Sequence, residues 1–330
     1  MKILAILEHQ NGRVHRMSWE TLAAAQQIGA EVDAALIGSG IAALAQEIAS
    51  KKIARVYAVE HALLENYTAD GYTAAIEALI RKGTLDKDRP DLVLFPHTYQ
   101  TRDFAPKLAA RFERSLISDA IAARVENSSP VFVRQFFQGK LNGDIRPTGP
   151  GPHFVSLQAG AWRADALESG PTSIGGAIEM FTPELNPSQI RQAPEAPFRE
   201  SARAVDLTAA EIIVSVGRGI GDKDKIPVVE DLARALGAEL AASRPICDAG
   251  WLPMERQVGS SGQTVSPKMY VAVGISGAIQ HLVGMKGSKI IVAINKDANA
   301  PIFEVADYGI VGDLFEVVPA LADEIRKAKA

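Results

Sequence analysis

The stretch Tyr270–Asp297, YVAVGISGAIQHLVGMKGSKIIVAINKD, decides the fold class of this chain of 330 residues. It runs from a short apolar segment, Tyr270–Val273, through the glycine turn Gly274–Gly277 into the helical segment Ala278–Met285, and it ends in a second apolar segment, Lys289–Ile294. Strand, turn, helix and strand in this order predict a β-α-β unit of a parallel sheet. Such a unit brings free backbone N–H groups and the positive end of a helix dipole to the carboxyl edge of the sheet, where a phosphate group can bind.

The same alternation of strand and helix continues on both sides of this stretch. Further strands are expected at Ile3–Leu7, Val32–Ile37, Arg55–Val59, Leu92–Phe95, Glu211–Val216, Glu239–Ala242 and Gly309–Val311. Helices are expected at Ser18–Ile28, with Ser18 as N-cap, and at Ile41–Ser50, Asp70–Lys82, Phe104–Phe112, Ile226–Leu236 and Val318–Lys329. This alternation predicts an α/β fold with mainly parallel sheets that are covered by helices on both faces.

The apolar pattern changes to period two between Ala122 and Gln158. Val131–Phe137, a turn at Gln138–Gly143 and then Phe154–Leu157 predict antiparallel strands at a sheet edge or in an arm.

Proline residues interrupt regular structure between Thr182 and Glu211, at Pro183, Pro187, Pro194 and Pro197. A chain of this length, with 47% apolar residues, can build two cores. We therefore expect an N-terminal domain over residues 1–190, a linker at 191–209 and a C-terminal domain over 210–330.

Composition excludes several classes of function. The net charge of −4 argues against non-specific nucleic-acid binding, and no apolar run reaches the ~18 residues of a membrane span. The single cysteine, Cys247, allows no intrachain disulfide. The N-terminal MKILAILEHQNGRV predicts a first strand and no signal peptide, so a cytoplasmic, prokaryotic location is expected.

No residues form a convincing catalytic or metal-binding pattern. A nucleophilic triad is not recognisable, the six histidines do not pair at metal-ligand spacings, and Cys247 is interpreted as a packed small residue. The Gly38-Ser39-Gly40 turn lacks a third glycine and is interpreted as a plain turn. The segment His97–Arg102 either lines a cleft or forms a solvated loop.

Four polar or glycine-rich turns follow predicted strands in the second half: Gly217–Gly221, Ser243–Arg244, Gly274–Gly277 and Asn295–Asp297. In an open parallel sheet these turns converge on one edge, where ligands bind. The loop Gln257–Thr264 adds small donors, and Arg218 and Arg244 add fixed positive charge. Together they predict a bound nucleotide.

These motifs resemble those of the alpha subunit of electron transfer flavoproteins, in the same order. They cover nearly all of Gly217–Leu314, and residues 1–200 resemble the family's N-terminal domain more loosely. The matching segments are Gly217-Arg218-Gly219, Ser243-Arg244-Pro245, Asp248-Ala249-Gly250, Gln257-Val258-Gly259, Tyr270–His281, Val292–Asp297 and Ala306–Val311.

The resemblance implies two Rossmann-like domains, of which the C-terminal one is a doubly wound FAD-binding domain. It implies a heterodimer in which FAD lies mainly on this domain, in a cleft facing a beta subunit. The family takes single electrons from flavin dehydrogenases, such as acyl-CoA dehydrogenases, and passes them to a membrane quinone oxidoreductase or another acceptor. It is a carrier, so we expect no substrate turnover by this chain itself.

The resemblance also assigns cofactor contacts residue by residue. Arg218, Ser243 and Arg244 approach the flavin and phosphate region. The loop Gln257, Val258, Gly259, Ser260 and Ser261 passes the flavin ring, with the Ser261 hydroxyl near N5. Ser276, Gly277, Ala278, Ile279, Gln280 and His281 form the phosphate turn and bring His281 to the pyrimidine side. Asn295, Asp313 and Leu314 serve the phosphate, ribose and adenine end.

The sequence departs from the family pattern at Ser261 and Gln263, where many relatives carry Thr and Lys. Since serine keeps the hydroxyl, we expect binding to persist and the flavin potential to be the property that differs. An added electron puts negative charge on the N1/O2 side of the ring, which His281, if protonated, or the Arg244 guanidinium would stabilise. One charge-assisted hydrogen bond, worth roughly 1.5–3 kcal/mol, would move the potential by on the order of 100 mV.

Three other functions stay open from the sequence. The chain could belong to an electron-bifurcating flavoprotein that oxidises NADH through a second FAD. It could be an interaction scaffold with a structural nucleotide. It could be a nicotinamide-dependent dehydrogenase, although no acid/base pair for a substrate is recognisable.

Overall fold

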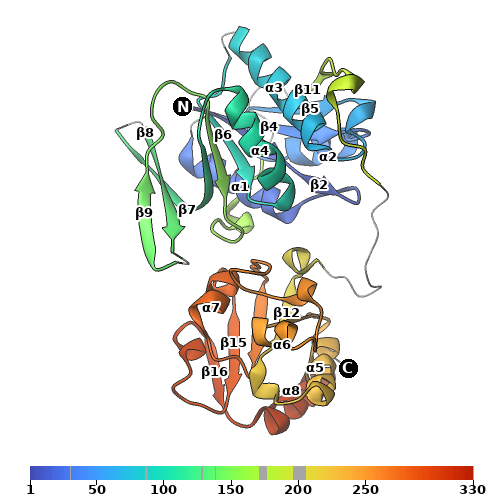
Figure 1. The fold of residues 1–330 in the computed structure, drawn as a ribbon, viewed down its shortest axis with the longest axis vertical. Coiled ribbons are helices and arrows are strands. Elements are labelled where there is room, and N and C mark those ends of the chain that lie inside the picture. The colour runs from blue at the N-terminus through green and yellow to red at the C-terminus, as the bar shows by residue number, and fades with distance from the viewer. Residues whose placement is uncertain are drawn as a thin grey trace. The chain divides into compact units, whose positions relative to one another are not determined.

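The computed structural model describes residues 1–29, 31–85, 88–127, 129–137, 139–170, 177–195 and 206–329. The described residues form two compact units (Figure 1). The N-terminal unit lies within residues 1–136 and 141–195, and the C-terminal unit contains residues 206–329 together with the short segment at 137 and 139–140. The expected linker contains residues 196–205, which lie outside the described residues, so the domain boundaries remain a prediction. Among the described helices, none combines the length and the apolar character needed to span a membrane.

The N-terminal unit is built on a nine-stranded sheet with the order β11-β5-β4-β1-β6-β10-β7-β8-β9. Neighbours run parallel from β11 to β7, and β8 and β9 continue the sheet in antiparallel fashion. The bounds are β1 Lys2–Leu7, β4 Glu31–Gly38, β5 Arg55–Glu60, β6 Leu92–Pro96, β7 Leu116–Glu126, β8 Ser129–Phe136, β9 Leu141–Ile145, β10 His153–Leu157 and β11 Ile178–Phe181. A separate antiparallel pair joins β2 (His9–Gln10) and β3 (Arg13–Val14).

The antiparallel prediction is correct for Val131–Phe136, which belongs to β8 and pairs antiparallel with β7 and β9, but wrong for Phe154–Leu157. The turn expected at Gln138–Gly143 is shorter than predicted, because Leu141–Gly143 belong to β9. Phe154–Leu157 form β10, which lies between β6 and β7 and runs parallel to both. Phe154, Val155, Ser156 and Leu157 are all buried. A strand in the middle of a parallel sheet is covered on both faces and therefore reads as a continuous apolar run, which a search for alternation misplaces.

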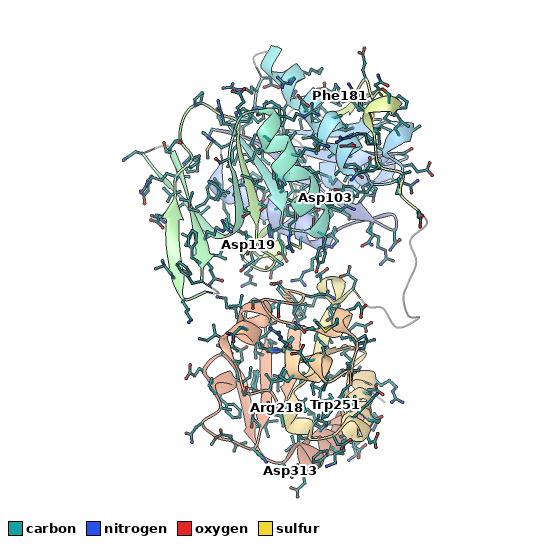
Figure 2. The ribbon with its side chains drawn as sticks, viewed as in Figure 1. Asp103, Asp119, Phe181, Arg218, Trp251 and Asp313 are labelled. Carbon is teal, nitrogen blue, oxygen red and sulfur yellow. The ribbon has the colours of Figure 1, made fainter. Side chains whose placement is uncertain are left out.

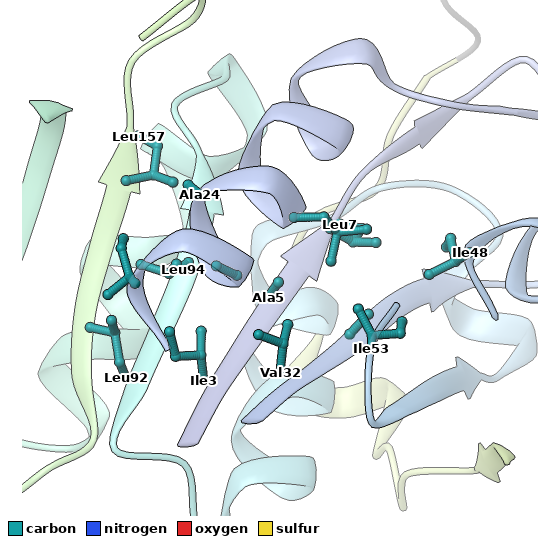
Figure 3. Packing of buried hydrophobic residues seen from close by; sticks show 14 of the residues in the cluster. Ile3, Ala5, Leu7, Ala24, Val32, Ile48, Ile53, Leu92, Leu94 and Leu157 are labelled. Carbon is teal, nitrogen blue, oxygen red and sulfur yellow. The ribbon is translucent and has the colours of Figure 1, made fainter. Parts of the chain in front are cut away.

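Helices cover both faces of this sheet. The bounds are α1 Arg16–Ile28, α2 Ala42–Ala49, α3 Ala69–Leu85 and α4 Tyr99–Arg111, with 3-10 turns at Ala62–Leu64, Ala164–Ala166 and Pro187–Gln189. One core joins α1 and α2 to the sheet, and in Figure 3 Ala24 of α1 lies near Leu94 of β6, whereas Ile48 of α2 lies farther along the sheet, near Ile53. A second core joins α3 and α4 to the other face. The unit is thus doubly wound.

Two helix starts differ from the prediction. The imidazole of His15, rather than Ser18, caps α1 by accepting a bond from the Met17 N–H, while the Ser18 hydroxyl bonds both backbone groups of Glu8. Helix α4 begins before Phe104 because the Thr98 hydroxyl accepts the N–H of Thr101 at 3.1 Å. The segment at 97–102 is therefore a two-residue link after β6 followed by the first residues of α4.

The C-terminal unit holds a five-stranded sheet in which all neighbours are parallel, in the order β13-β12-β14-β15-β16. Its strands are β12 Ile212–Val216, β13 Glu239–Ala242, β14 Met269–Val273, β15 Ile291–Asn295 and β16 Tyr308–Val311. Its helices are α5 Ile226–Leu236, α6 Arg244–Asp248, α7 Ile279–Met285 and α8 Leu314–Lys329, with 3-10 turns at Leu207–Ala209, Arg218–Ile220, Lys223–Lys225, Met254–Arg256 and Pro301–Glu304.

Both faces of this second sheet are also covered. Helices α5, α6 and α8 pack on one face, and α7 with the segment around Val258 and Val265 packs on the other. Helix α8 begins earlier than the expected Val318, because the Asp313 carboxylate accepts the N–H of Phe315 at 2.8 Å and caps the first turn. The expected α/β class with two Rossmann-like, mainly parallel sheets is confirmed.

Candidate functional site

The turns that follow the strands of the C-terminal sheet enclose a cavity of about 670 Å³. This volume lies within the range of small-molecule and cofactor sites. The lining residues come from the turns after β12, β13, β14, β15 and β16 and from the loop before β14. They are Arg218, Gly219, Ser243, Arg244, Pro245, Gln257, Val258, Gly259, Ser260, Ser261, Gly274, Ile275, Ser276, Ala278, Gln280, His281, Asn295, Lys296, Gly312, Asp313, Leu314 and Phe315.

Two of these turns touch each other through their backbones. The N–H of Gly219 donates to the carbonyl of Gly274 at 3.0 Å. A Cβ atom at Gly217 would lie 2.3 Å from that same carbonyl oxygen. Only glycine allows this approach, so the turns after β12 and β14 form one continuous wall of the cavity.

The turn after β14 is held against a second segment at Gly277. This residue has φ 89°, and a Cβ atom there would lie 2.2 Å from the backbone nitrogen of Ile302. The Ile302 N–H donates to the carbonyl of Ser276 at 3.0 Å. The turn can therefore approach Ile302 only because residue 277 has no side chain.

Two polar side chains of the cavity wall also hold the wall together. The Asn295 amide donates to the carbonyl of Ile275 at 2.9 Å, and its oxygen accepts the N–H of Asp297 at 3.0 Å. The Asp313 carboxylate caps α8. Asn295 thus links the turns after β14 and β15, in addition to lining the cavity.

Positive charge exceeds negative charge around the cavity. Arg218, Arg244 and Lys296 line it, against the single carboxylate of Asp313. Arg244 forms an exposed ion pair with Asp248 at 3.2 Å, whereas Arg218 and Lys296 make no ion pair with the described residues. Figure 2 marks Arg218 and Asp313, which follow β12 and β16. Such a wall suits an anionic ligand.

The loop before β14 is fixed to its neighbours by backbone and amide bonds. Val258 N–H donates to the carbonyl of Ala242 at 2.9 Å, and Ser260 N–H donates to the carbonyl of Gln280 at 2.8 Å. The Gln257 amide donates to Ser261 Oγ at 3.0 Å, while Gln257 Oε1 is buried without a hydrogen-bond partner among the described groups. Because Ser261 Oγ accepts this bond, its own hydrogen stays available to a ligand.

His281 is buried, with 7% of its surface exposed, and it is neutral near pH 7. Burial lowers its pKa to about 4, and the neighbouring Val258 carbonyl only partly offsets that shift. Its Nε2 lies 3.0 Å from the Tyr270 hydroxyl, and its Nδ1 makes no ordinary hydrogen bond with the described groups. Burial therefore favours the neutral imidazole over the protonated form considered from the sequence. Of His281 and Arg244, Arg244 is the one with a permanent positive charge.

All the sequence-predicted site residues lie in this one lining except Gly277 and Ile279. Gly277 is buried against Ile302, and the Ile279 side chain is 52% exposed. Sequence reasoning did not select Gly219, Pro245, Gly274, Ile275, Lys296, Gly312 and Phe315. Each is adjacent in the chain to a predicted residue or lies in a predicted turn. Their positions at the ends of predicted strands could therefore have identified them.

Other groups considered from the sequence have structural explanations. The Gly40 N–H donates to Glu60 Oε1 at 2.7 Å, as in a plain turn. Cys247 is buried in the C-terminal core, where burial raises the pKa of its thiol to about 11. Within the described parts of the chain, no group of three or more histidine, cysteine or acidic side chains could hold a metal ion.

A doubly wound α/β unit with a cationic cavity at the carboxyl edge of its sheet defines a nucleotide-cofactor protein. Family comparison gives the particular family: residues 206–286 match the electron transfer flavoprotein FAD-binding domain, and residues 3–183 match the electron transfer flavoprotein domain. The chain belongs to the electron transfer flavoprotein family, and its C-terminal unit carries the family's FAD-binding domain.

Relatives match over almost their full length. Electron transfer flavoprotein subunit alpha of Bacillus subtilis is 40% identical over 328 residues, which covers 99% of this chain and 98% of the relative. The proteins of the same name from Syntrophomonas wolfei and Mycobacterium tuberculosis (strain H37Rv) are each 39% identical and cover 97–99% of this chain and 98–99% of their own. A solved glycotransferase of kitacinnamycin covers 99% of this chain and 94% of its own, but its TM-score of 0.29 and 15% identity are too low for an argument.

The residues of the cavity fit FAD, the cofactor of the matched domain. Cations suit a diphosphate, and the glycine turns let backbone N–H groups approach it. Two buried polar atoms, His281 Nδ1 and Gln257 Oε1, belong to lining residues and have no ordinary hydrogen-bond partner among the described groups. Because native proteins rarely leave such atoms unpaired, they suit a polar ligand.

Proposed function

We propose that this chain is the FAD-bearing alpha subunit of a heterodimeric electron transfer flavoprotein. In this proposal it pairs with a beta subunit, accepts single electrons from flavin dehydrogenases such as acyl-CoA dehydrogenases, and passes them to a membrane quinone oxidoreductase or another acceptor. The observation that carries the proposal is the cationic cavity, which gathers unpaired buried polar atoms within the FAD-binding domain. The shared name of the full-length relatives supports the pairing.

Within the cavity we assign the diphosphate to Arg218, Lys296 and the turn at Ser276. Arg218 and Lys296 are exposed and have no ion-pair partner among the described residues, so they can bind an anion without breaking an existing bond. Arg244 would first have to share its guanidinium with Asp248. We assign the flavin ring to the wall formed by Ser261 and His281, because these uncharged side chains can donate hydrogen bonds to it. FAD supplies the redox chemistry, and the chain supplies position and charge.

The direct test is to purify the chain with its beta subunit and to measure the visible flavin absorbance. The expected result is a bound flavin that an acyl-CoA dehydrogenase and its substrate reduce, and that a quinone oxidoreductase reoxidises. A heterodimer without flavin would overturn the assignment of the cavity. A heterodimer whose flavin no dehydrogenase can reduce would favour an interaction scaffold with a structural nucleotide.

The same preparation separates a simple carrier from an electron-bifurcating flavoprotein. A simple carrier retains one redox-active flavin per heterodimer and does not oxidise NADH directly. Two redox-active flavins, with NADH oxidation in the absence of any dehydrogenase, would replace the simple-carrier assignment by the bifurcating one.

A further inference from the structure

The Tyr270 hydroxyl is buried in the C-terminal core beside the cavity. Tyr270 lies on β14, opposite Ile213 on β12, and none of its surface is exposed. Its hydroxyl lies 3.0 Å from Nε2 of His281, the cavity residue on α7. A tyrosine used only for packing would not need a polar atom at this depth, so the bond between the two rings needs an explanation.

The direction of this bond follows from the donors and acceptors present. Burial raises the pKa of the phenol, so its oxygen keeps the proton and must donate it. Ser215, its neighbour on β12, partly offsets that pKa shift but falls short of an ordinary hydrogen bond. His281 Nε2 is therefore the acceptor with good geometry. A neutral imidazole that accepts at Nε2 carries its own proton on Nδ1.

The opposite end of the imidazole is left as a donor. Nδ1 of His281 is buried and makes no ordinary hydrogen bond with the described groups. The Val258 carbonyl lies near the ring and partly offsets the lowering of its pKa. The Tyr270 hydroxyl is therefore the group that selects the tautomer.

We propose that Tyr270 is a positioning residue for the cofactor: its hydroxyl holds His281 as the neutral imidazole protonated at Nδ1, and so presents an N–H donor to an acceptor atom on the pyrimidine side of the flavin. This inference rests on the proposed FAD site. When bound, FAD takes up electrons and gains negative charge on that side of its ring, which a donor stabilises. The Tyr270 hydroxyl therefore raises the flavin potential without touching the flavin.

The first test reads the tautomer directly. Histidine ring nitrogens labelled with ¹⁵N in the FAD-loaded heterodimer are assigned to His281 by comparison with His281→Ala. We expect a protonated Nδ1 and an unprotonated Nε2 at pH 7, and a mixture of tautomers in Tyr270→Phe. A proton on Nε2, or on both nitrogens, in the unsubstituted protein would overturn the proposal. This result does not depend on whether Tyr270→Phe folds.

The second test separates positioning from packing with a double-mutant cycle. Midpoint potentials of the bound flavin are measured for the unsubstituted protein, Tyr270→Phe, His281→Ala and the double variant. We expect Tyr270→Phe to move the one-electron equilibrium up to about tenfold toward the oxidised flavin, which is about 59 mV. The same substitution should have no effect in the His281→Ala background. An equal shift in both backgrounds would overturn the role assigned to Tyr270.

A matched control removes another buried tyrosine hydroxyl. Tyr72 lies in the N-terminal unit, where its hydroxyl donates to the carbonyl of Ile37 at 3.2 Å, and Tyr72→Phe should leave the flavin potential unchanged. Failure of the unsubstituted heterodimer to bind FAD would overturn the proposed cofactor site itself. Bound FAD with a potential that is insensitive to Tyr270→Phe would overturn only the inference about Tyr270.

Discussion

The two units of this protein use the carboxyl edges of their parallel sheets in opposite ways. In each unit, the first strand of the sheet has neighbours on both sides. Strand β1 lies between β4 and β6, and β12 lies between β13 and β14. At such a position the chain turns to opposite sides, and α/β proteins commonly bind ligands there. The C-terminal unit has its cavity at this edge, whereas the N-terminal unit fills the equivalent place with its own side chains.

Glu8 closes the N-terminal edge. It follows β1, is buried, and accepts hydrogen bonds from the hydroxyls of Thr98 and Thr101, which follow β6. Burial raises the pKa of this carboxyl to about 7, against the smaller opposite effect of the two threonines. The hydroxyls of Thr98 and Thr101 are therefore used within the protein.

At the C-terminal edge the corresponding positions carry glycine. Gly217, Gly219 and Gly274 bring the backbones of two turns together, and the polar side chains around them keep unused donors and acceptors. The comparison teaches that the winding of the sheet supplies a place for a ligand, and that the residues at the strand ends decide whether it is used.

Closing the C-terminal edge should have the largest effect. Gly277→Val places a β-branched side chain at a positive φ and within 2.2 Å of the Ile302 nitrogen. Strain and overpacking together should lower the free energy of unfolding of this unit by about 2–6 kcal/mol and abolish FAD binding. Denaturant titration and flavin retention measure both effects.

The control for this variant is Gly237→Ala. Gly237 ends α5 at φ 72°, and a Cβ atom there would meet no heavy atom within 4 Å. It should cost only the backbone strain, about 1 kcal/mol, and keep the flavin. Equal losses in the two variants would show that the approach to Ile302 has no special role.

At the N-terminal edge, Glu8 should make the free energy of unfolding depend on pH. Because the folded chain raises the pKa of Glu8 from 4.5 to about 7, its contribution to stability is complete below pH 4.5 and is lost as the pH rises to 7. That loss amounts to about 3 kcal/mol. Glu8→Gln should remove this part of the pH dependence. Denaturant titrations of both proteins at pH 5 and pH 8 give the difference, and parallel curves would contradict the assignment.

A smaller effect, on FAD affinity, is expected when one cationic side chain of the cavity is removed. Arg218→Ala should weaken FAD binding about tenfold, since one charge-assisted contact to a phosphate is lost, and the difference should shrink at high salt. Fluorescence titration of FAD at two ionic strengths measures it. Lys286→Ala removes an exposed charge outside the cavity lining and should leave the affinity unchanged. A similar loss in both variants would assign the effect to overall charge.

The sequence predicts strands and turns of the site well because these depend on neighbours in the chain. The apolar runs of β14 and β15 and the glycine that ends α5 are local signals. Most of the site residues were then predicted from their positions at the ends of strands, because parallel strands end at a common edge.

What the sequence did not predict depends on distant partners. The parallel placement of Phe154–Leu157 is set by pairing with β6 and β7. The neutral state of His281 results from burial beneath the loop at Val258 and from the register that puts Tyr270 beside it. Closure of the N-terminal edge requires Glu8 and Thr98 to meet across 90 residues. None of these follows from periodicity.

The smallest effect is expected at Ser261, whose hydroxyl proton is used differently from those of Thr98 and Thr101 at the N-terminal edge. The hydroxyls of Thr98 and Thr101 donate inward to Glu8, whereas Ser261 Oγ accepts from Gln257 and keeps its hydrogen for the ligand. Ser261→Ala should therefore remove one neutral hydrogen bond, about 0.5–1.5 kcal/mol, and shift the flavin potential by at most roughly 60 mV. Spectroelectrochemical titration measures the shift. Ser288→Ala is the control, because the Ser288 hydroxyl donates to the carbonyl of Met285 at 2.6 Å and Ser288 lies outside the cavity lining. An unchanged potential in Ser261→Ala would mean that this hydroxyl, like those of the N-terminal edge, serves the protein and not the ligand.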